Sequence, residues 1–270
     1  MFEALRSLFS SSTQPEAPRA SVPEGTRYYV IGDIHGRLDL YNALIDAIEA
    51  DDAKAGKADT RVILLGDLVD RGPESAGVVE RTREWQKQRN VRVLAGNHEQ
   101  MFLDAFEKPD VLRHFLRHGG RETILSYGVD EDDFTQMTLE ELFEALPRAI
   151  PKADLKYIAA FEESITAGDY MFVHAGVDPK APLDQQKRKD LLWIRDRFLN
   201  YDGPLAKVVV HGHTIFDTVI DCGNRIGIDT GAFRSGVLTA LVLEGDRRRT
   251  VQTTASPTDP IGIVHTDTLN

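Results

Sequence analysis

Residues that can bind metal ions occur in three short segments, each directly after an apolar run. The segments are GDIHG with Asp33 and His35, GDLVDRG with Asp67 and Asp70, and GNHE with Asn97 and His98. Carboxylate, imidazole and amide groups suit Mn, Fe or Zn, whereas the usual thiolate clusters need several cysteines and the sequence has only Cys222. The residue set therefore predicts a metal site.

Further histidines follow later apolar runs: His174 in VHAG, and His211 and His213 in VHGHT. A single aspartate or histidine at a strand end is commonly a cap or a turn residue. Three such segments in one order, followed by two histidine segments, are improbable as independent accidents. The set therefore predicts one shared site. His211 and His213 fall on the same face of a strand, and His211 either supports the site from behind or is a packed side chain.

The elements that must position these residues begin with three buried strands, in the apolar runs that start at Tyr28, Val62 and Val91. Stretches with helical periodicity, residues 38–50 and 74–88, separate the three runs. Strands and helices that alternate in this way indicate parallel βαβ units. Ligands of such sheets lie at the carboxyl ends of the strands, which is where the three segments fall.

The pattern changes from residue 100 to 161, where short helical segments with Pro and Gly breaks predict an inserted helical cap. Strand-like runs return at Tyr170, Lys207, Ile226 and Val237 and predict a mixed or antiparallel β-layer. We therefore expect an α/β fold of four layers, αββα. Residues 1–26 are rich in Ser and Pro and predict a flexible N-terminal segment, and residues 27–270 a single domain.

A formal net charge of -11 disfavours binding to nucleic acid, because the surface field repels polyanions. No apolar run approaches the roughly 20 residues that span a bilayer, and Glu3 and Arg6 interrupt the apolar start of the chain. We expect a cytoplasmic protein with no membrane partner. The pattern leaves its oligomeric state open.

The order GDIHG, GDLVDRG, GNHE, VHAG and GHT resembles the calcineurin-like metallophosphoesterases, and more narrowly the bacterial PPP-type serine/threonine protein phosphatases. The resemblance covers about Tyr28 to Leu243 and implies the four-layer sandwich of that superfamily. It also implies two divalent metal ions, Mn in the first place, with Fe or Zn as alternatives. The ligands it implies are Asp33 and His35 for the first ion, Asp67 as the bridge, and Asn97, His174 and His213 for the second.

The same resemblance assigns roles in catalysis. It implies that His98 is the general acid with Asp70 as its orienting carboxylate, and that Arg71 and Arg195 bind the phosphate. The activity it implies is hydrolysis of phosphoserine and phosphothreonine in proteins, by in-line attack of a hydroxide shared by the two metals. The segment IDTGAF from Ile228 departs from the eukaryotic PPP enzymes. Two alternatives remain: a symmetrical diadenosine tetraphosphate hydrolase, or another small phosphate ester as substrate. A catalytically silent phosphate-binding module is the non-enzyme alternative.

Overall fold

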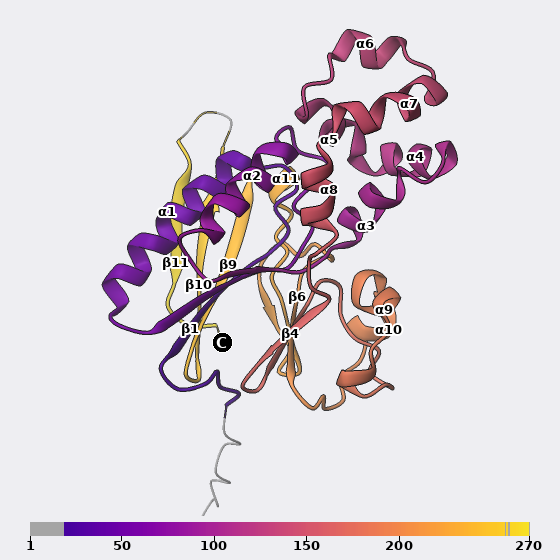
Figure 1. The fold of residues 1–270 in the computed structure, drawn as a ribbon. Helices are drawn as coiled ribbons and strands as arrows, with labels where there is room; N and C mark the ends of the chain where they lie inside the picture. The colour runs from indigo at the N-terminus through magenta and orange to yellow at the C-terminus, as the bar shows by residue number, and fades with distance from the viewer. Residues whose placement is uncertain (1–18, 257, 259, 270) are drawn as a thin grey trace, which may run out of the picture.

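Two β-sheets form the centre of the molecule, and helices lie on both sides of them (Figure 1). The computed structural model describes residues 19–256, 258 and 260–269. The strand order is β11-β10-β9-β1-β2-β3 in the first sheet and β4-β5-β6-β8-β7 in the second. Among the described residues, no helix is both long enough and apolar enough to cross a bilayer.

The first part of the chain forms the predicted parallel units. Strands β1 (Thr26–Ile31), β2 (Asp59–Leu64) and β3 (Val91–Val93) run parallel, with Tyr29 opposite Val62. Helices α1 (Leu38–Ala55) and α2 (Ser75–Gln86) connect them. Because these crossovers place both helices on one face of the sheet, the carboxyl ends of the three strands meet at the same edge.

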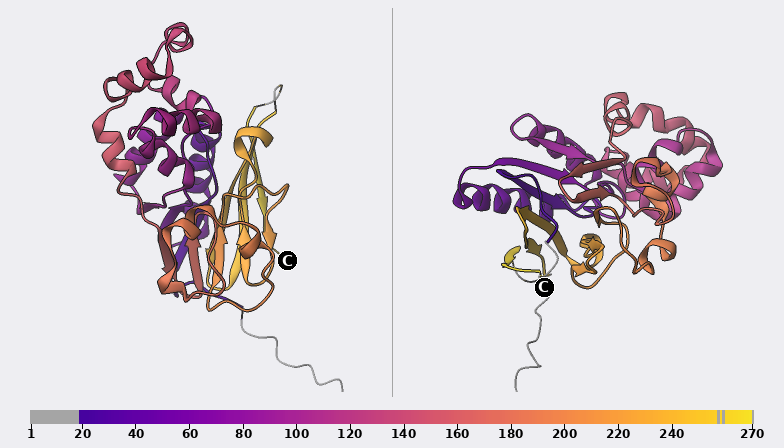
Figure 2. Two further views of the ribbon diagram at one scale, coloured as in Figure 1. Left: turned by 90° about the vertical axis from the view of Figure 1, so that its right-hand side faces the viewer. Right: turned by 90° about the horizontal axis from the view of Figure 1, so that it is seen from below.

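The four layers follow from the alternation of side chains along the strands. In β1, Tyr29 and Ile31 pack with α1 and α2, whereas Tyr28 and Val30 pack between the two sheets. On the far side of the second sheet, its strands pack against α9 (Arg188–Trp193) and α10 (Asp196–Leu199). The order helix, sheet, sheet, helix confirms the predicted αββα architecture (Figure 2).

The strands of the second half are divided between the sheets, which differs from the single β-layer expected from sequence. Strands β4 (Ser164–Ala167), β5 (Tyr170–Val173), β6 (Val208–His211), β7 (Ile220–Asp221) and β8 (Arg225–Gly227) form the second sheet. Strands β9 (Val237–Glu244), β10 (Arg247–Thr254) and β11 (Gly262–Thr266) extend the first sheet, with β9 antiparallel to β1. The reason is burial: β9 is apolar on both faces and needs a partner strand at each edge, which β1 and β10 provide.

Between β3 and β4 the chain is folded into helices, several of which project beyond the ends of the sheets (Figures 1 and 2). They are α3 (Asn97–Asp104), α4 (Pro109–Phe115), a π-helical turn (Leu116–Gly120), α5 (Arg121–Ser126), α6 (Glu131–Gln136), α7 (Leu139–Ala149) and α8 (Lys152–Ile158). The remaining short helices are a 3-10 turn (Leu183–Gln185) and α11 (Ala232–Ser235).

The expected flexible segment, residues 1–26, contains residues that pack against the sheets. Residues 1–18 lie outside the described part of the chain. Val22 is only 3% exposed, lies between the sheets, and donates its N–H to the carbonyl oxygen of Gly245 at 3.0 Å. The hydroxyl of Tyr170 donates to the carbonyl oxygen of Ala20 at 3.0 Å. These contacts correct the prediction for residues 20–22, whose few apolar side chains fill the end of the core without any sequence periodicity.

Candidate metal centre

The predicted ligands follow the carboxyl ends of strands from both sheets. In the second sheet, β5, β6 and β8 are also parallel, so their carboxyl ends point the same way. The six side chains come from five places: Asp33 and His35 after β1, Asp67 after β2, Asn97 at the start of α3 after β3, His174 after β5, and His213 after β6. The sandwich therefore brings the predicted ligands of both halves of the chain to one edge.

Two groups of buried side chains could each hold a metal ion, and Asp67 belongs to both. The first group is His35, Asp67 and His98, and the second is Asp67, His174 and His213. Within each group the candidate ligand atoms lie within 4.8 Å of one another. A carboxylate that belongs to both groups has the position that a ligand bridging two metal ions requires. The first group contains His98, the predicted acid, where the sequence analysis expects Asp33.

The hydrogen bonds of two histidines show that this site suits cations. Nδ1 of His35 lies 2.8 Å from the carbonyl oxygen of Val69, and Nδ1 of His174 lies 2.9 Å from that of Leu65. Carbonyl oxygens only accept, so both Nδ1 atoms carry the proton and both Nε2 atoms present lone pairs.

The lone pair of His174 faces oxygen atoms that also cannot donate, whereas the lone pair of His35 faces both Asp67 and the guanidinium of Arg71, which donates to it at 3.0 Å. Oδ2 of Asp67 lies 3.6 Å from Nε2 of His35 and 3.4 Å from Nε2 of His174. Burial lowers the pKa of both imidazoles, which keeps them neutral and able to bind a metal. A carboxylate oxygen between two lone pairs is stabilised by a cation on each side, and the residues therefore fit a pair of metal ions.

Asn97 and Asp33 complete the predicted ligand set. Oδ1 of Asn97 lies 2.7 Å from Nδ1 of His213 and 2.9 Å from Nε2 of His174. Oδ2 of Asp33 lies 4.0 Å from Nε2 of His35. Burial raises the pKa of Asp33 well above its usual range, and the nearby carboxylate of Asp229 adds to the effect.

Asp229 is a further buried carboxylate, one that the sequence analysis did not select. It is 2% exposed, and burial raises its pKa to about 6. Its signal was present, because IDTG after β8 places an aspartate and a glycine directly after a buried strand, as at the other strand ends. A carboxylate that is costly to ionise when buried becomes favourable once a cation is bound beside it.

The backbone at the site is unusual. Among the described residues, the non-glycine residues with positive φ are all predicted site residues: His35 (φ 47), Asp67 (φ 50), Asp70 (φ 73), Arg71 (φ 69) and His213 (φ 63). This region of backbone space is sparsely populated for residues with a Cβ atom, and such strain persists only where surrounding contacts stabilise it. The concentration of strain at this edge supports a functional role for the whole set.

Glu99 provides much of that support, although the sequence analysis gave it no role. Its buried carboxylate accepts backbone N–H groups from Asp67 at 2.8 Å, Leu68 at 2.7 Å, Val69 at 3.3 Å and Gly96 at 2.8 Å. It therefore ties the loop after β2 to the start of α3. The side chain of Asp67 approaches the backbone of Gly96 so closely that only glycine fits there, because a Cβ atom at this position would lie 2.1 Å from Oδ1 of Asp67.

The predicted acid and its carboxylate form a close pair. Nδ1 of His98 lies 2.7 Å from Oδ2 of Asp70, and both side chains are buried. Burial by itself lowers the pKa of His98, but the charges of Asp67 and Asp70 together raise it above its usual value. Arg71 donates to Nε2 of His35 at 3.0 Å and to Nε2 of His98 at 2.9 Å. A fixed positive charge therefore lies beside both imidazoles.

Arg195 lies at the edge of the site with an exposed side chain. Its guanidinium makes no hydrogen bond or ion pair with another described residue, and its charge contributes to the lowered pKa values of His174 and His213, after burial and closer charges. Trp193 stands beside it, with its ring 6.5 Å from that of His213. A cavity of about 470 Å³ opens next to this indole and is lined by Gln100, Arg188, Lys189 and Trp193.

The sequence analysis leaves two roles open for His211, support of the site from behind or simple packing. In the structure its side chain packs against aromatic rings. Its ring lies 5.1 Å from that of Phe198 and 6.2 Å from that of Phe216. Burial lowers its pKa to about 4, so the imidazole is neutral. It belongs to neither group of candidate ligands.

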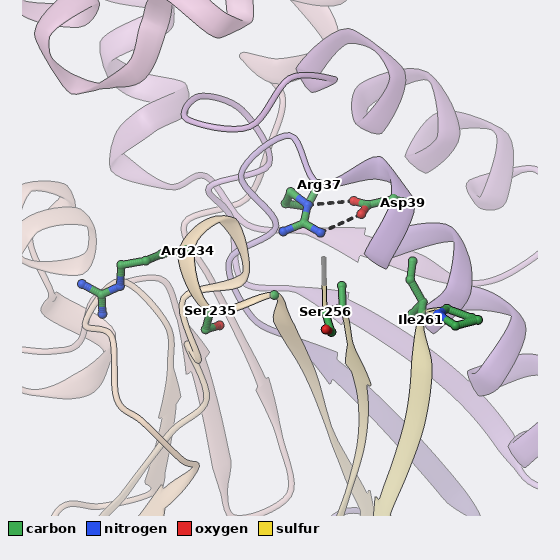
Figure 3. Close-up of a pocket in the computed structure, with 9 residues that line it drawn as sticks. Arg37, Asp39, Arg234, Ser235, Ser256 and Ile261 are labelled. Atoms are coloured by element: carbon green, nitrogen blue, oxygen red, sulfur yellow. Dashed lines mark hydrogen bonds and ion pairs between the residues drawn. The ribbon is translucent and has the colours of Figure 1, made fainter. Parts of the chain in front are cut away.

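A second hollow, of about 570 Å³, lies beside α11 and contains Arg37, Asp39, Arg234, Ser235, Ser256 and Ile261 among its lining residues (Figure 3). Arg37 is bound there to Asp39 at 2.6 Å and to the carbonyl oxygen of Ala232 at 2.9 Å. The predicted site residues are absent from the described residues that line this hollow.

Comparison with known proteins agrees with this geometry. The family model described as calcineurin-like phosphoesterase matches residues 26–230. The chain is 31% identical over 217 residues to serine/threonine-protein phosphatase 1 of Salmonella typhimurium, which covers 78% of this chain and 89% of that protein. It is 25% identical over 233 residues to an asymmetrical bis(5'-nucleosyl)-tetraphosphatase of Anoxybacillus flavithermus, which covers 79% of this chain and 89% of that protein.

One solved structure, of a proposed diadenosine tetraphosphatase, matches with a TM-score of 0.58 and 20% identity. The match covers 92% of this chain and 99% of that one, which shows a shared fold. The family match, the strand order and the convergence of Asp and His side chains all agree. The chain belongs to the calcineurin-like phosphoesterase family.

Proposed function

We propose that this protein is a metal-dependent phosphoprotein phosphatase that hydrolyses phosphoserine and phosphothreonine. Two divalent ions, Mn²⁺ in the first place, would be held by Asp33, His35, Asp67, Asn97, His174 and His213. When bound, two such ions supply an activated water and neutralise the charge of the phosphoryl group. The position of Asp67 in both groups of candidate ligands supports a bridging role.

The observation that carries the proposal is the His98–Asp70 pair. Asp70 holds Nδ1 of His98 at 2.7 Å, so Nε2 is the atom left to donate a proton. A serine or threonine leaves as a strongly basic alkoxide, which needs that proton, and His98 would transfer it to the leaving oxygen to give the free hydroxyl.

Arg71 and Arg195 would bind the phosphoryl oxygens. In this structure Arg71 donates to Nε2 of His98, which is possible only while that nitrogen carries a lone pair. Protonation of His98 displaces Arg71 from it and frees the guanidinium for a phosphoryl oxygen. Arg195, exposed and without a partner among the described residues, offers a second planar cation that suits the same anion.

The cavity beside Trp193 offers room for the rest of a substrate. The indole N–H of Trp193 donates to Oε1 of Gln100 at 3.0 Å, and Arg188 is paired with Glu163 at 2.7 Å. Lys189 is exposed and makes no hydrogen bond or ion pair with another described residue. The free cation at this cavity suits an acidic residue near the phosphorylated one. The Salmonella relative at 31% identity, named as a serine/threonine phosphatase, supports the same substrate class.

A bis(5'-nucleosyl)-tetraphosphatase is the second candidate, supported by the relative at 25% identity. The exposed indole of Trp193 beside His213 could stack on a nucleobase. That relative is of the asymmetrical type, whereas the alternative drawn from the sequence is the symmetrical type. A phosphate leaving group has a second pKa of about 6 and needs little help from an acid, so the His98–Asp70 pair favours the alkyl ester.

The test is a panel of substrates with the metal-free protein and with protein reconstituted with Mn²⁺. The panel contains a phosphoserine peptide, a phosphotyrosine peptide, diadenosine tetraphosphate and a cyclic phosphodiester. We expect the highest kcat/KM for the phosphoserine peptide and no turnover without metal. A preference for diadenosine tetraphosphate would establish the second candidate instead. Full turnover after exhaustive chelation, checked by elemental analysis, would refute the metal-dependent reaction.

A further inference from the structure

A threonine from the helical segment 97–158 reaches the carboxylate that orients the acid. Thr123, in α5, is fully buried. Its hydroxyl oxygen lies 2.6 Å from Oδ1 of Asp70 and 2.8 Å from the backbone nitrogen of Asp70. These two contacts join residues 53 positions apart in sequence. The helical segment therefore touches the catalytic pair itself.

The directions of these hydrogen bonds follow from the available protons. The carboxylate of Asp70 only accepts, so the hydroxyl of Thr123 donates to Oδ1 and accepts the N–H of Asp70. The hydroxyl of Ser75 lies 3.0 Å from the Asp70 nitrogen and 3.0 Å from the Thr123 hydroxyl. Ser75 therefore donates to Thr123, and every donor and acceptor of the Thr123 hydroxyl is used.

The other carboxylate oxygen of Asp70 binds His98. Oδ2 lies 2.7 Å from Nδ1 of His98, while Oδ1 accepts the proton of Thr123. With one oxygen held by Thr123, rotation of the carboxylate about its Cβ–Cγ bond breaks a hydrogen bond to a buried group. Thr123 thus limits the orientation of Asp70 and, through it, the plane of the His98 imidazole.

The residue next to Asp70 is held by the same part of the chain. The backbone N–H of Arg71 donates to the carbonyl oxygen of Gly119 at 3.0 Å. Gly119 has φ 101, and a Cβ atom at this position would lie 2.7 Å from Cγ of Arg71. Asp70 and Arg71 both have positive φ, 73 and 69, so the dipeptide depends on contacts from outside its own loop.

We propose that Thr123 is a positioning residue for the His98–Asp70 pair, and that Gly119 positions Arg71 in the same way. This inference rests on the proposed function only in taking His98 as a general acid for a phosphate monoester. Helix α5 and the π-helical turn before it then act in catalysis as well as covering the site. A change in this segment alters the chemical step even where the metal ligands and the substrate are unchanged.

The experiment compares Thr123→Val, Thr123→Ser and the matched control Thr82→Val, all reconstituted with Mn²⁺. Thr82 is also buried in a helix and hydrogen bonded, to Val78 and Tyr41, but touches no site residue. Single-turnover rates are measured with phenyl phosphate, a poor leaving group, and 4-nitrophenyl phosphate, a good one. We expect Thr123→Val to slow phenyl phosphate roughly 10-fold more than 4-nitrophenyl phosphate, part of the 10²–10⁴-fold effect of a positioned acid. Thr123→Ser should restore the ratio, and Thr82→Val should leave it unchanged.

A spectroscopic measurement on the metal-free protein tests the same idea without turnover. The Nδ1 proton of His98, assigned in ¹H–¹⁵N spectra by comparison with His98→Asn, should shift in Thr123→Val and keep its position in Thr82→Val. If neither aryl phosphate is hydrolysed but this shift occurs, the proposed function fails and the positioning role stands. If Thr123→Val does not fold, Ser75→Ala replaces it, with a smaller change of the same ratio expected.

Gly119→Ala gives an independent result on the arginine. It should weaken inhibition by inorganic phosphate roughly 10-fold, because a displaced guanidinium loses charge-assisted hydrogen bonds to the anion. Equal slowing of both aryl phosphates in Thr123→Val at unchanged metal content would overturn the positioning role of Thr123. Failure of Thr123→Ser to restore the ratio would do the same. Unchanged phosphate inhibition in Gly119→Ala would overturn the role of Gly119.

Discussion

Oδ2 of Asp70 lies 2.7 Å from Nδ1 of His98, and the exposed fraction of the two side chains is 0% and 2% respectively. The carboxylate accepts the proton of Nδ1, so Nε2 is the nitrogen of His98 that faces the site. The neighbouring Asn97 belongs to the predicted ligands, so the proposed acid lies directly beside the candidate metal centre.

Replacement of His98 should affect substrates according to their leaving groups. We expect His98→Asn to slow a phosphoserine peptide by roughly 10²–10⁴-fold and 4-nitrophenyl phosphate far less, because only the alkoxide must be protonated. Single-turnover rates at matched metal content measure the chemical step without product release. Equal slowing of both substrates would mean that His98 stabilises charge or positions the nucleophile instead.

Asp67→Asn should be the most damaging ligand change, because Asp67 belongs to both groups of candidate ligands. The amide can still accept the backbone N–H of His98 that Oδ1 accepts at 2.9 Å, so the fold should survive. We expect the affinity for both Mn²⁺ ions to fall by more than the roughly 10–100-fold typical of residues that only support a ligand. Calorimetric titration measures this, with the exposed Asp59→Asn as the control. Two ions bound as tightly as in the wild type would exclude a bridge.

Arg71→Ala and Arg195→Ala should each weaken inhibition by inorganic phosphate while metal content stays unchanged. Loss of charge-assisted hydrogen bonds worth about 1.5–3 kcal/mol corresponds to a roughly 10–100-fold higher inhibition constant. Arg71→Lys should recover only part of the inhibition by inorganic phosphate, because an ammonium cannot form two parallel hydrogen bonds. The control is Arg197→Ala, since Arg197 is exposed like Arg195 but is paired with Asp190 at 2.5 Å. Loss of metal in Arg71→Ala would show that its contacts to His35 and His98 support the ligands instead.

Glu99→Gln should lower stability even though Glu99 is not a predicted ligand. One amide NH₂ group would replace an oxygen that accepts two backbone N–H groups, and those donors would be left buried and unpaired. A cost of about 1–3 kcal/mol is typical of such a group. Thermal unfolding of the metal-free protein measures the change, and Glu107→Gln, on the exposed end of the same region, is the control. An unfolding temperature equal to that of the wild type would mean that the backbone groups find other partners.

Lys189 should favour phosphopeptides with an acidic neighbour. We expect Lys189→Ala to lower kcat/KM for such a peptide by roughly 2–5-fold, the effect of an exposed ion pair worth about 0.5–1 kcal/mol. A peptide with a neutral neighbour should be unaffected, and Lys187→Ala, which does not line the cavity, should change neither. An equal effect on both peptides would remove Lys189 from substrate selection.

Much of the site could be predicted from sequence because its ligands follow local rules. Each predicted strand ends in a turn that carries Asp, Asn or His, and parallel strands place their carboxyl ends at one edge. This rule alone predicts that the segments GDIHG, GDLVDRG and GNHE lie at one edge of the sheet. The structure brings their side chains together there.

Tertiary structure alone decided which residues support that set. Glu99 accepts N–H groups from residues about 30 positions away, and Thr123 reaches Asp70 across 53 positions. The segment GNHE marks Glu99 only as a residue near the start of a helix, and Thr123 lies in a helix without any motif. In the same way, the apolar sequence of β9 predicted a buried strand but not its place beside β1. A residue's polarity and spacing report whether it is buried, whereas the partner it meets depends on how distant elements pack, and that is decided only when the whole chain folds.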